Sequence, residues 1–178
     1  ERLIELSPGK KQYWVQRAAV QHHLERDAKA AATLQLADQA ALLNEDREFR
    51  QLARLLFLRE QPYQCAKTVE EALKNGVVKP DAETYRLLSN CYIAARENEK
   101  ALEPLAKAAE LAPDGEMYLL LGQMHLQRER FEPALDALQK ALAKSKPERR
   151  GSAQLLIGVA QLGSERYDAA ERAFRAAQ

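Results

Sequence analysis

A short stretch near the start of the sequence places two histidines close to a carboxylate. His22 and His23 are adjacent, and Asp27 follows His23 by four residues. On one continuous helix His23 and Asp27 would share a face and offer two metal ligands. A zinc site normally takes three or four protein ligands, and neither CxxC nor HExxH occurs here. The pattern therefore favours solvated histidines over a metal centre. His125, at an inner helix position, similarly favours core packing over catalysis.

The glycines and acidic residues give no catalytic motif. The segment GVAQLGS at residues 158–164 is the nearest match to a phosphate-binding loop, but it lacks the lysine and a preceding strand. Gly158 is better interpreted as a close helix contact and Gly163 as a turn glycine. Asp and Glu are abundant, yet the sequence ties none of them to an apolar pocket, so general acid-base chemistry has no anchor. We predict a protein that is not an enzyme and binds no cofactor or metal.

Two cysteines, Cys65 and Cys91, are the remaining reactive side chains. Both occupy positions expected to be buried in helices, where cysteine behaves as a small hydrophobic residue. A disulfide requires the two Cα atoms to lie within about 7 Å of each other. The sequence alone does not place them, so the pairing stays open.

The composition sets the class of fold that must position these residues. The chain has 178 residues, of which 30% are charged, and its 27 Lys and Arg nearly balance 26 Asp and Glu. This balance does not favour nucleic acid as a partner. Good helix formers dominate, and valine and isoleucine are few. No apolar run approaches the roughly 20 residues that span a bilayer. The sequence predicts an all-helical segment with no membrane insertion of its own.

Small residues recur at a fixed spacing along the whole chain. The five sets are Ala18, Ala30 and Ala37; Ala53, Cys65 and Ala72; Ser89, Ala101 and Ala108; Gly122, Ala134 and Ala141; and Gly158, Ala170 and Ala177. The first members of successive sets are 35, 36, 33 and 36 residues apart. A self-similar period of this length indicates a solenoid of repeated units.

These residues and spacings resemble the tetratricopeptide repeat family, whose unit is a pair of antiparallel helices of about 34 residues. The resemblance implies an all-α, right-handed superhelical solenoid of about five repeats. Its small residues would lie where the two helices cross and where one repeat meets the next, because bulk there would force the helices apart. Pro113 would end a second helix.

The repeat frame divides the chain into a tail of a preceding repeat and five repeats. These segments are residues 1–10, 11–45, 46–81, 82–114, 115–150 and 151–178. LIELSP at residues 3–8 matches AELAP at 109–113, so we expect the sequence to open inside a repeat. It also continues one residue past Ala177 without a polar capping helix. We therefore expect a fragment of a longer array.

Several irregularities distinguish this array from a generic one. Pro62 lies in a turn that is one residue longer, and KNGVVKPD at 74–81 lengthens a connection in which Gly76 and Asp81 are candidate helix caps. KSKPERRG at 144–151 predicts an exposed basic loop. Pro104 falls two turns into a helix and predicts a mild kink. In the first repeat, Arg17 and Gln21 replace large apolar residues, which predicts a weakly packed, polar repeat.

The longer turns, together with SPGKKQYW at residues 7–14, resemble periplasmic tetratricopeptide proteins associated with TonB–ExbB–ExbD systems of Gram-negative bacteria. This resemblance implies a periplasmic protein that is an accessory of an envelope energy-transduction complex. A cytoplasmic location is the alternative.

The family resemblance also identifies a surface for partner binding. In such arrays the first helices line a concave groove that holds a peptide or partner helix. The matching residues, which we call the first-helix face, are Arg47, Arg50, Arg54, Phe57, Arg86, Asn90, Ile93, Leu119, Gln123, Leu126, Leu155, Val159 and Leu162. This set is basic at one end and apolar at the other. Because arginine pairs well with carboxylates, the expected partner carries acidic residues beside an aliphatic stretch.

Two functions remain in competition. The chain could be a non-catalytic scaffold that binds a peptide or partner protein through the first-helix face. It could instead be a structural element that forms homodimers or stacks through the terminal repeat, around Tyr167 and Phe174. Reversal of the arginine charges tests the first hypothesis, and a mass measurement in solution tests the second.

Overall fold

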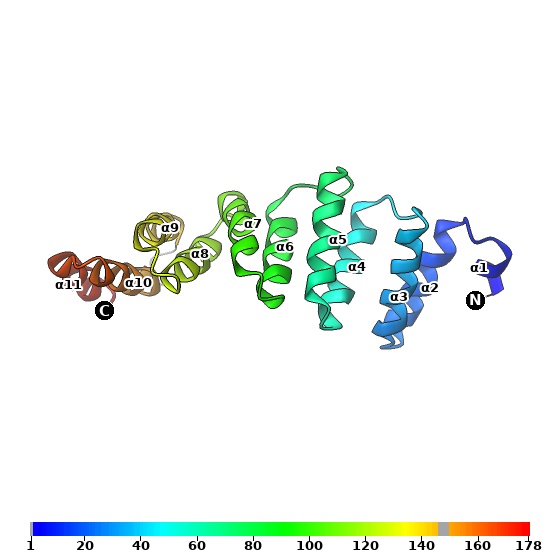
Figure 1. Ribbon diagram of the computed structural model, residues 1–178, viewed down its shortest axis with the longest axis horizontal. Helices are drawn as coiled ribbons and strands as arrows, with labels where there is room; N and C mark the ends of the chain where they lie inside the picture. The colour runs from blue at the N-terminus through cyan, green and yellow to red at the C-terminus, as the bar shows by residue number, and fades with distance from the viewer. Residues whose placement is uncertain (1, 146–149) are drawn as a thin grey trace. The chain divides into compact units, whose positions relative to one another are not determined.

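The chain is entirely helical over the residues that the computed structural model describes, 2–145 and 150–178 (Figure 1). Eleven helices and no strand are found there, which confirms the predicted fold class. The helices are α1 (Arg2–Leu6), α2 (Lys11–His23), α3 (Asp27–Gln39), α4 (Asp46–Leu58), α5 (Pro62–Lys74), α6 (Ala82–Ala94), α7 (Asn98–Leu111), α8 (Glu116–Leu126), α9 (Phe131–Lys144), α10 (Arg150–Gly163) and α11 (Tyr167–Ala176). The middle of the predicted basic loop, residues 146–149, lies outside the described residues.

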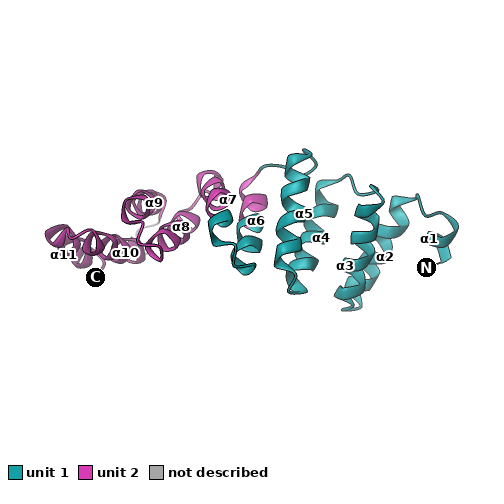
Figure 2. Cartoon of the chain, in the orientation of Figure 1, with its two compact units in different colours: residues 1–80, 87–101 teal, residues 81–86, 102–178 magenta. Residues whose placement is uncertain are grey.

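The helices form two compact units (Figure 2). Unit 1 comprises residues 1–80 and 87–101, and unit 2 comprises residues 81–86 and 102–178. In unit 1, α2 pairs with α3 and α4 pairs with α5, while α3 packs against α4. In unit 2, α8 pairs with α9 and α10 with α11, while α9 packs against α10. In these four pairs the helices lie against each other, and α3 and α9 also cover the first helix of the next pair.

The small repeat residues lie in the interior of the helix pairs. Fourteen of the fifteen are buried, and only Ala177 is half-buried. A Cβ atom added at Gly122 would lie 2.5 Å from Cγ of Leu138, and one added at Gly158 would overlap the ring of Phe174. Larger residues here would push the second helix off the first. The absence of side-chain bulk is what lets the helices approach.

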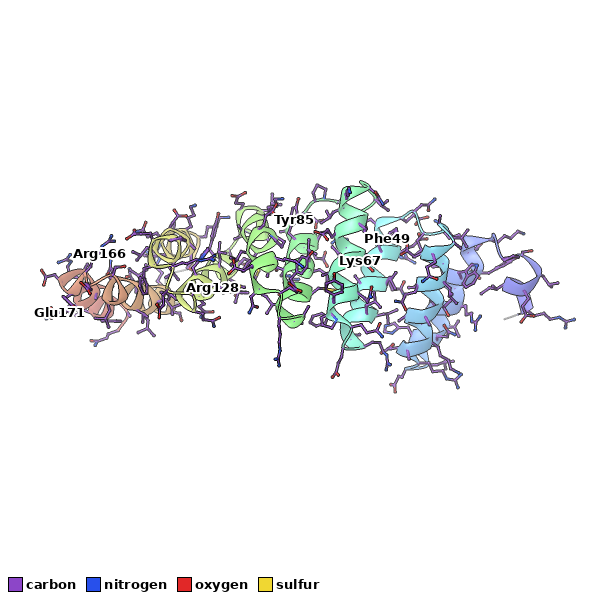
Figure 3. All side chains as sticks on the ribbon, viewed as in Figure 1. Phe49, Lys67, Tyr85, Arg128, Arg166 and Glu171 are labelled. Atoms are coloured by element: carbon purple, nitrogen blue, oxygen red, sulfur yellow. A yellow bond between two sulfur atoms is a disulfide. The ribbon has the colours of Figure 1, made fainter. Side chains whose placement is uncertain are left out.

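Leucines fill the space beside these crossings. Leu52 and Leu56 of α4 and Leu34 of α3 are fully buried in unit 1, and Phe49 of α4, labelled in Figure 3, is also buried. In unit 2, Leu138 belongs to a cluster with Ile157 and other small or branched residues of α9, α10 and α11. Burying one such side chain stabilises the fold by about 1.5–3 kcal/mol. Leucine and alanine are the commonest buried residues in each unit.

Two predicted helix caps are confirmed. At the end of α5, Gly76 has φ +68°, and the amides of Gly76 and Val77 donate to the carbonyls of Leu73 and Ala72 at 3.0 and 2.9 Å. This is a Schellman cap with glycine in the left-handed conformation. At the start of α6, the backbone N–H of Thr84 donates to Oδ1 of Asp81 at 2.8 Å. The longer connection is therefore built from two defined caps.

Prolines affect the helices in different ways. Pro62 is the first residue of α5, where the missing N–H costs nothing. Pro113 follows the end of α7 at Leu111, as predicted. Pro104 lies buried inside α7, and the helix continues through it without a break.

Cys65 of α5 and Cys91 of α6 form a disulfide within unit 1, with their Cα atoms 5.7 Å apart. The sequence left this pairing open. Both cysteines are fully buried, so the interpretation of each as a small interior residue agrees with the structure. The bond joins the second helix of one repeat to the first helix of the next.

Candidate binding surface

The basic part of the first-helix face lies on α4, and the start of this helix is fixed by a reciprocal cap. The side chains of Glu45 and Glu48 form a capping box, in which Oε2 of Glu48 accepts from the backbone N–H of Glu45 at 3.1 Å. Lys11 of α2 reaches this cap, with its Nζ 2.5 Å from Oε1 of Glu45 and 3.1 Å from Oε1 of Glu48. These charge-assisted contacts hold α4 against α2.

Three arginines follow this cap along one side of α4, at residues 47, 50 and 54. They line a cavity of about 390 Å³ together with His22 of α2 and with Gln51, Leu55 and Leu58 of α4. We call this cavity the basic pocket. Leu55 is buried and Leu58 is exposed, so the pocket combines an aliphatic wall with three permanent positive charges.

The arginines of the basic pocket differ in their surroundings. Nε of Arg50 donates to both carboxylate oxygens of Asp46 at 2.9 and 3.1 Å, and its side chain is only 12% exposed. Asp46 also accepts from the backbone N–H of Lys79 at 3.1 Å. Arg50 is therefore held in place by its neighbours. Arg47 and Arg54 are exposed.

His23 and Asp27 do not lie on one continuous helix. α2 ends at His23 and α3 begins at Asp27, so the two residues do not share a helix. Instead Nδ1 of His22 lies 2.6 Å from Oδ1 of Asp27, across the turn. No group of three or more potential metal-ligating side chains occurs among residues 2–145 and 150–178.

His22 was missed as a member of this surface, although a signal for it was present. It precedes Phe57 by 35 residues, which is one repeat, so it occupies the same position on its own first helix. Arg17 and Gln21 argue against a packed groove in the first repeat, whereas the repeat frame alone places His22 on this surface.

The other predicted residues of unit 1 are Phe57, Asn90 and Ile93. The ring of Phe57 is 40% exposed at the end of α4. On α6, Asn90 is exposed and Ile93 is half-buried. None of these three lines the basic pocket.

Arg86, the fourth predicted arginine, belongs to unit 2 and lines a different cavity. This cavity of about 290 Å³ contains the carboxylates of Glu83, Asp114 and Glu116 besides Arg86. Its acidic lining offsets the arginine charge. The basic character predicted for α4 and α6 together is therefore carried by α4.

The apolar part of the first-helix face lies in unit 2, on α8 and α10. Leu155, Val159 and Leu162 of α10 are 51, 42 and 49% exposed. Leu119 and Leu126 of α8 are partly buried and pack against the core cluster, and Gln123 is half-buried. Residues 117–127 and 151–164 contain no Asp, Glu, Lys or Arg, although such residues make up 30% of the chain. This part of the face is uncharged and aliphatic.

Burial raises the pKa of one tyrosine in unit 1. The hydroxyl of Tyr92 on α6 is removed from water and hydrogen-bonded to Glu70, and these effects raise its pKa to about 12. The side chain is neutral at physiological pH and serves packing. Within the described part of the chain, no helix combines the length and apolar character needed to cross a bilayer.

Comparison with solved structures identifies the same architecture. The MamA protein superimposes with a TM-score of 0.73 at 19% identity, covering 94% of this chain and 89% of MamA. YrrB, a tetratricopeptide repeat protein with an unusual peptide-binding site, gives a TM-score of 0.73 at 16% identity, with coverages of 99% and 89%. MamA from Desulfovibrio magneticus RS-1 gives 0.66 at 18% identity, with coverages of 94% and 92%.

Sequence comparison adds a match over the second half of the chain. The tetratricopeptide repeat family model matches residues 92–149 and 119–178. No curated protein matches the sequence significantly. The repeated small residues, the helix pairs and these matches agree, and the chain belongs to the tetratricopeptide repeat family.

Proposed function

We propose that the chain is a non-catalytic protein-interaction scaffold whose basic pocket captures an acidic segment of a partner protein. The observation that carries this proposal is the cluster of Arg47, Arg50 and Arg54 around one cavity of about 390 Å³. Asp46, which pairs with Arg50, does not line this cavity. The lining of the pocket contains three arginines and no acidic residue, which favours a carboxylate as its ligand.

The spacing of the exposed arginines sets the size of the ligand. Arg47 and Arg54 are seven residues apart, which is about 10 Å along a helix at 1.5 Å per residue. Two carboxylates separated by a few residues of a peptide can therefore engage both guanidinium groups. Each planar guanidinium can form two parallel hydrogen bonds to a carboxylate, which favours acidic side chains over neutral ones.

The uncharged face of unit 2 supports the second half of the proposal. Exposed Leu155, Val159 and Leu162 would be covered by an aliphatic stretch of the same partner. Burial of this stripe would contribute affinity, while the arginines would contribute selectivity and a fast encounter. The proposed partner therefore carries both an acidic segment and an aliphatic one.

The proposed location is the periplasm, where the chain would serve an envelope energy-transduction complex of the TonB type. The buried bond between Cys65 and Cys91 supports an oxidising compartment, because such bonds are rare where thiols are kept reduced. The cytoplasm remains the alternative. Denaturing cells in the presence of a thiol-alkylating agent distinguishes the two locations. In a cytoplasmic protein Cys65 and Cys91 would be free thiols and would be alkylated, whereas in a periplasmic protein their disulfide would prevent alkylation.

A charge-reversal experiment tests the basic pocket. The probe is a fluorescent peptide of about twelve residues with two glutamates beside three leucines, and its affinity is measured by anisotropy. We expect Arg47→Glu with Arg54→Glu to weaken binding at least tenfold, since two attractions become repulsions. The matched control reverses two exposed arginines of α11, Arg172→Glu with Arg175→Glu, and should bind as the wild type does. Equal loss in both variants, or in neither, would reject the basic pocket as the site.

Self-association through the terminal repeat is disfavoured by the residues of α11. In α9, Leu135 belongs to the core cluster and Leu142 packs against that cluster. One repeat later these positions are Glu171 and Gln178, and Glu171 forms an exposed ion pair with Arg175 (Figure 3). Phe174 is half-buried against Gly158, and only Tyr167 is an exposed aromatic residue there. A mass by light scattering that does not rise with concentration would agree with this assignment.

A further inference from the structure

One residue of the basic pocket is a histidine, and its charge varies over a range of pH in which arginine stays charged. His22, in the last turn of α2, lines the pocket together with the arginines of α4. Its side chain is 51% exposed and is therefore in contact with water. Histidine ordinarily changes its charge between about pH 5 and 8, whereas arginine remains protonated throughout. Among the lining residues, His22 is thus the one that can vary the charge of the pocket.

A carboxylate across the following turn is the partner of His22. Nδ1 of His22 lies 2.6 Å from Oδ1 of Asp27, the first residue of α3. Because the carboxylate accepts this hydrogen bond, Nδ1 carries a proton in both charge states, and Nε2 is the nitrogen that gains or loses one. Protonation of His22 therefore changes the pair from a single negative charge to a neutral ion pair.

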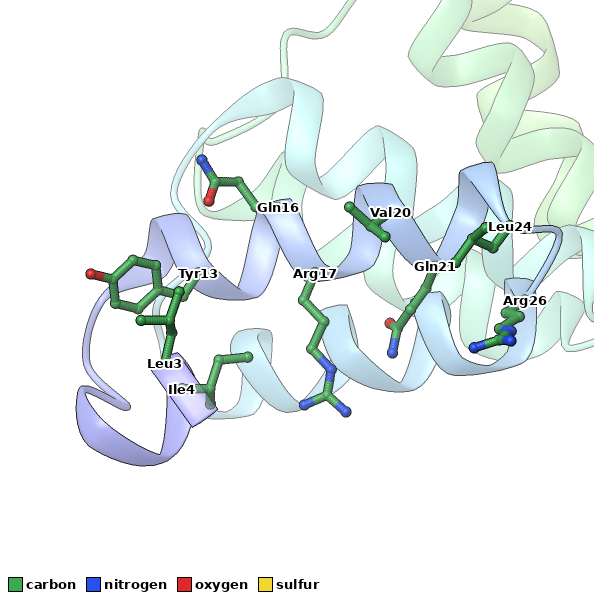
Figure 4. A pocket seen from close by; sticks show the side chains of 9 residues that line it. All are labelled: Leu3, Ile4, Tyr13, Gln16, Arg17, Val20, Gln21, Leu24 and Arg26. Carbon is green, nitrogen blue, oxygen red and sulfur yellow. The ribbon is translucent and has the colours of Figure 1, made fainter. Parts of the chain in front are cut away.

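The turn between α2 and α3 holds this pair beside the pocket. The backbone N–H groups of Glu25 and Arg26 donate to the carbonyls of His22 and Gln21 at 2.9 and 2.8 Å. Gln21 and Arg26 are labelled in Figure 4, where they line a neighbouring cavity and not the basic pocket. These backbone hydrogen bonds do not depend on the charge of His22. The pair therefore stays at the edge of the pocket when that charge changes.

The charged groups around His22 come from α3 and α4, and they are Asp27, Arg47, Arg50 and Arg54. Asp46 pairs with Arg50, and α1 contributes none of the residues that line the pocket. Carboxyl groups ordinarily titrate near about pH 4 and guanidinium groups above about pH 12. A change between about pH 5.5 and 7.5 acts instead on histidine side chains. The chain has three of them, His22, His23 and His125.

We propose that His22 makes the capture of the acidic segment depend on pH, with tighter binding under mildly acidic conditions. This inference rests on the proposed function of the basic pocket. While His22 is neutral, the carboxylate of Asp27 places a negative charge beside the pocket and repels an acidic ligand. Protonation of His22 offsets that charge and gives Nε2 a proton to donate to a ligand carboxylate. Binding is then strongest when His22 is protonated and weakens as the pH rises.

The fluorescent acidic peptide of the charge-reversal experiment is also the probe here. Its affinity is measured by anisotropy at about pH 5.5 and about pH 7.5, at one ionic strength; a free glutamate titrates near about pH 4.3, so the peptide stays charged at both values. We expect binding about fourfold tighter at the lower pH, the effect of one added unit charge near a ligand charge in a partly solvated site. A peptide with glutamine in place of both glutamates should show no such difference.

Three variants assign the effect to the pair. His22→Asn keeps a donor for Asp27 but carries no variable charge, so it should bind equally at both pH values. His23→Asn is the matched control, because His23 is the adjacent exposed residue and does not line the pocket, and it should keep the fourfold difference. Asp27→Asn should bind more tightly than the wild type at about pH 7.5, since it removes the repelling charge. Far-UV circular dichroism at both pH values checks that the variants stay folded.

NMR of the histidine rings gives a second readout, because proton binding and peptide binding must affect each other equally. At about pH 6.5 the Cε1–H signal of His22 should move toward its protonated position as the peptide is added, and that of His23 should stay in place. The inference is overturned if the wild type binds equally at both pH values or if His22→Asn keeps the difference.

The same measurements separate this inference from the proposed function. A peptide that loses affinity on Arg47→Glu with Arg54→Glu, but whose binding does not respond to pH, would overturn the role of His22 and leave the basic pocket as the site. A peptide that shows no saturable binding at either pH would overturn both.

Discussion

Glu60, the turn residue between α4 and α5, has a left-handed backbone conformation with φ +55°. Its amide and that of Gln61 donate to the carbonyls of Phe57 and Leu56, which completes a Schellman cap. The same position of every other repeat also has positive φ, and the residues are Glu25, Arg96, Glu129 and Glu165. Glycine is the usual residue for this conformation, and none of these turns contains it there. No glycine marks these caps in the sequence, whereas Gly76 marks the cap at the end of α5.

Glycine at one of these turns should stabilise the fold. The left-handed conformation costs a non-glycine residue about 1–2 kcal/mol, and glycine loses about 0.5–1 kcal/mol through its freer unfolded state. We expect Glu60→Gly to raise the free energy of unfolding by about 0.5 kcal/mol in urea titrations. Glu71→Gly, within α5, is the control and should lower it by about 1 kcal/mol. A destabilised Glu60→Gly would show that the caps carry no strain.

At the scale of the helices, the disulfide between α5 and α6 is a constraint on their packing that the sequence alone did not predict. Small residues at fixed spacing were enough to predict where helices cross, because the period of the repeat places them on defined faces. The distance between Cys65 and Cys91 depends on how two neighbouring repeats are packed, which the period does not specify. Likewise, His23 and Asp27 lie on different helices because a turn separates α2 from α3. The residue with positive φ in this turn is Glu25, and no glycine indicates the turn in the sequence.

Reduction of this disulfide should weaken unit 1. Closing a chain segment with a sequence separation of 26 residues reduces the entropy of the unfolded state and stabilises the fold by about 3.5 kcal/mol in the chain-entropy model. We expect a reductant to shift the urea midpoint of the wild type downward. Cys65→Ala with Cys91→Ala should show no such response, because it has no bond to break. If a reductant that reaches the buried disulfide left the urea midpoint of the wild type unchanged, this stabilising role would be contradicted.

For the whole molecule, one surface predicted from the repeat pattern becomes two surfaces of different chemistry. The composition predicted the helical class, and the resemblance to the tetratricopeptide repeat family implied the small crossing residues and the arginine stripe of α4. It predicted a single face that is basic at one end and apolar at the other. The structure assigns the arginine pocket to unit 1 and the uncharged leucine face to unit 2, with Arg86 in a cavity that also contains carboxylates.

The central claim is that the basic pocket on α4 binds an acidic segment, and NMR of arginine side chains tests it directly. The Nε–Hε signals of the protein are recorded while the acidic peptide is added. We predict that Arg47 and Arg54 shift along one saturable curve, with Arg50 following, whereas Arg172 and Arg175 stay in place. Saturable binding of the peptide with no shift at Arg47 and Arg54 would contradict the claim.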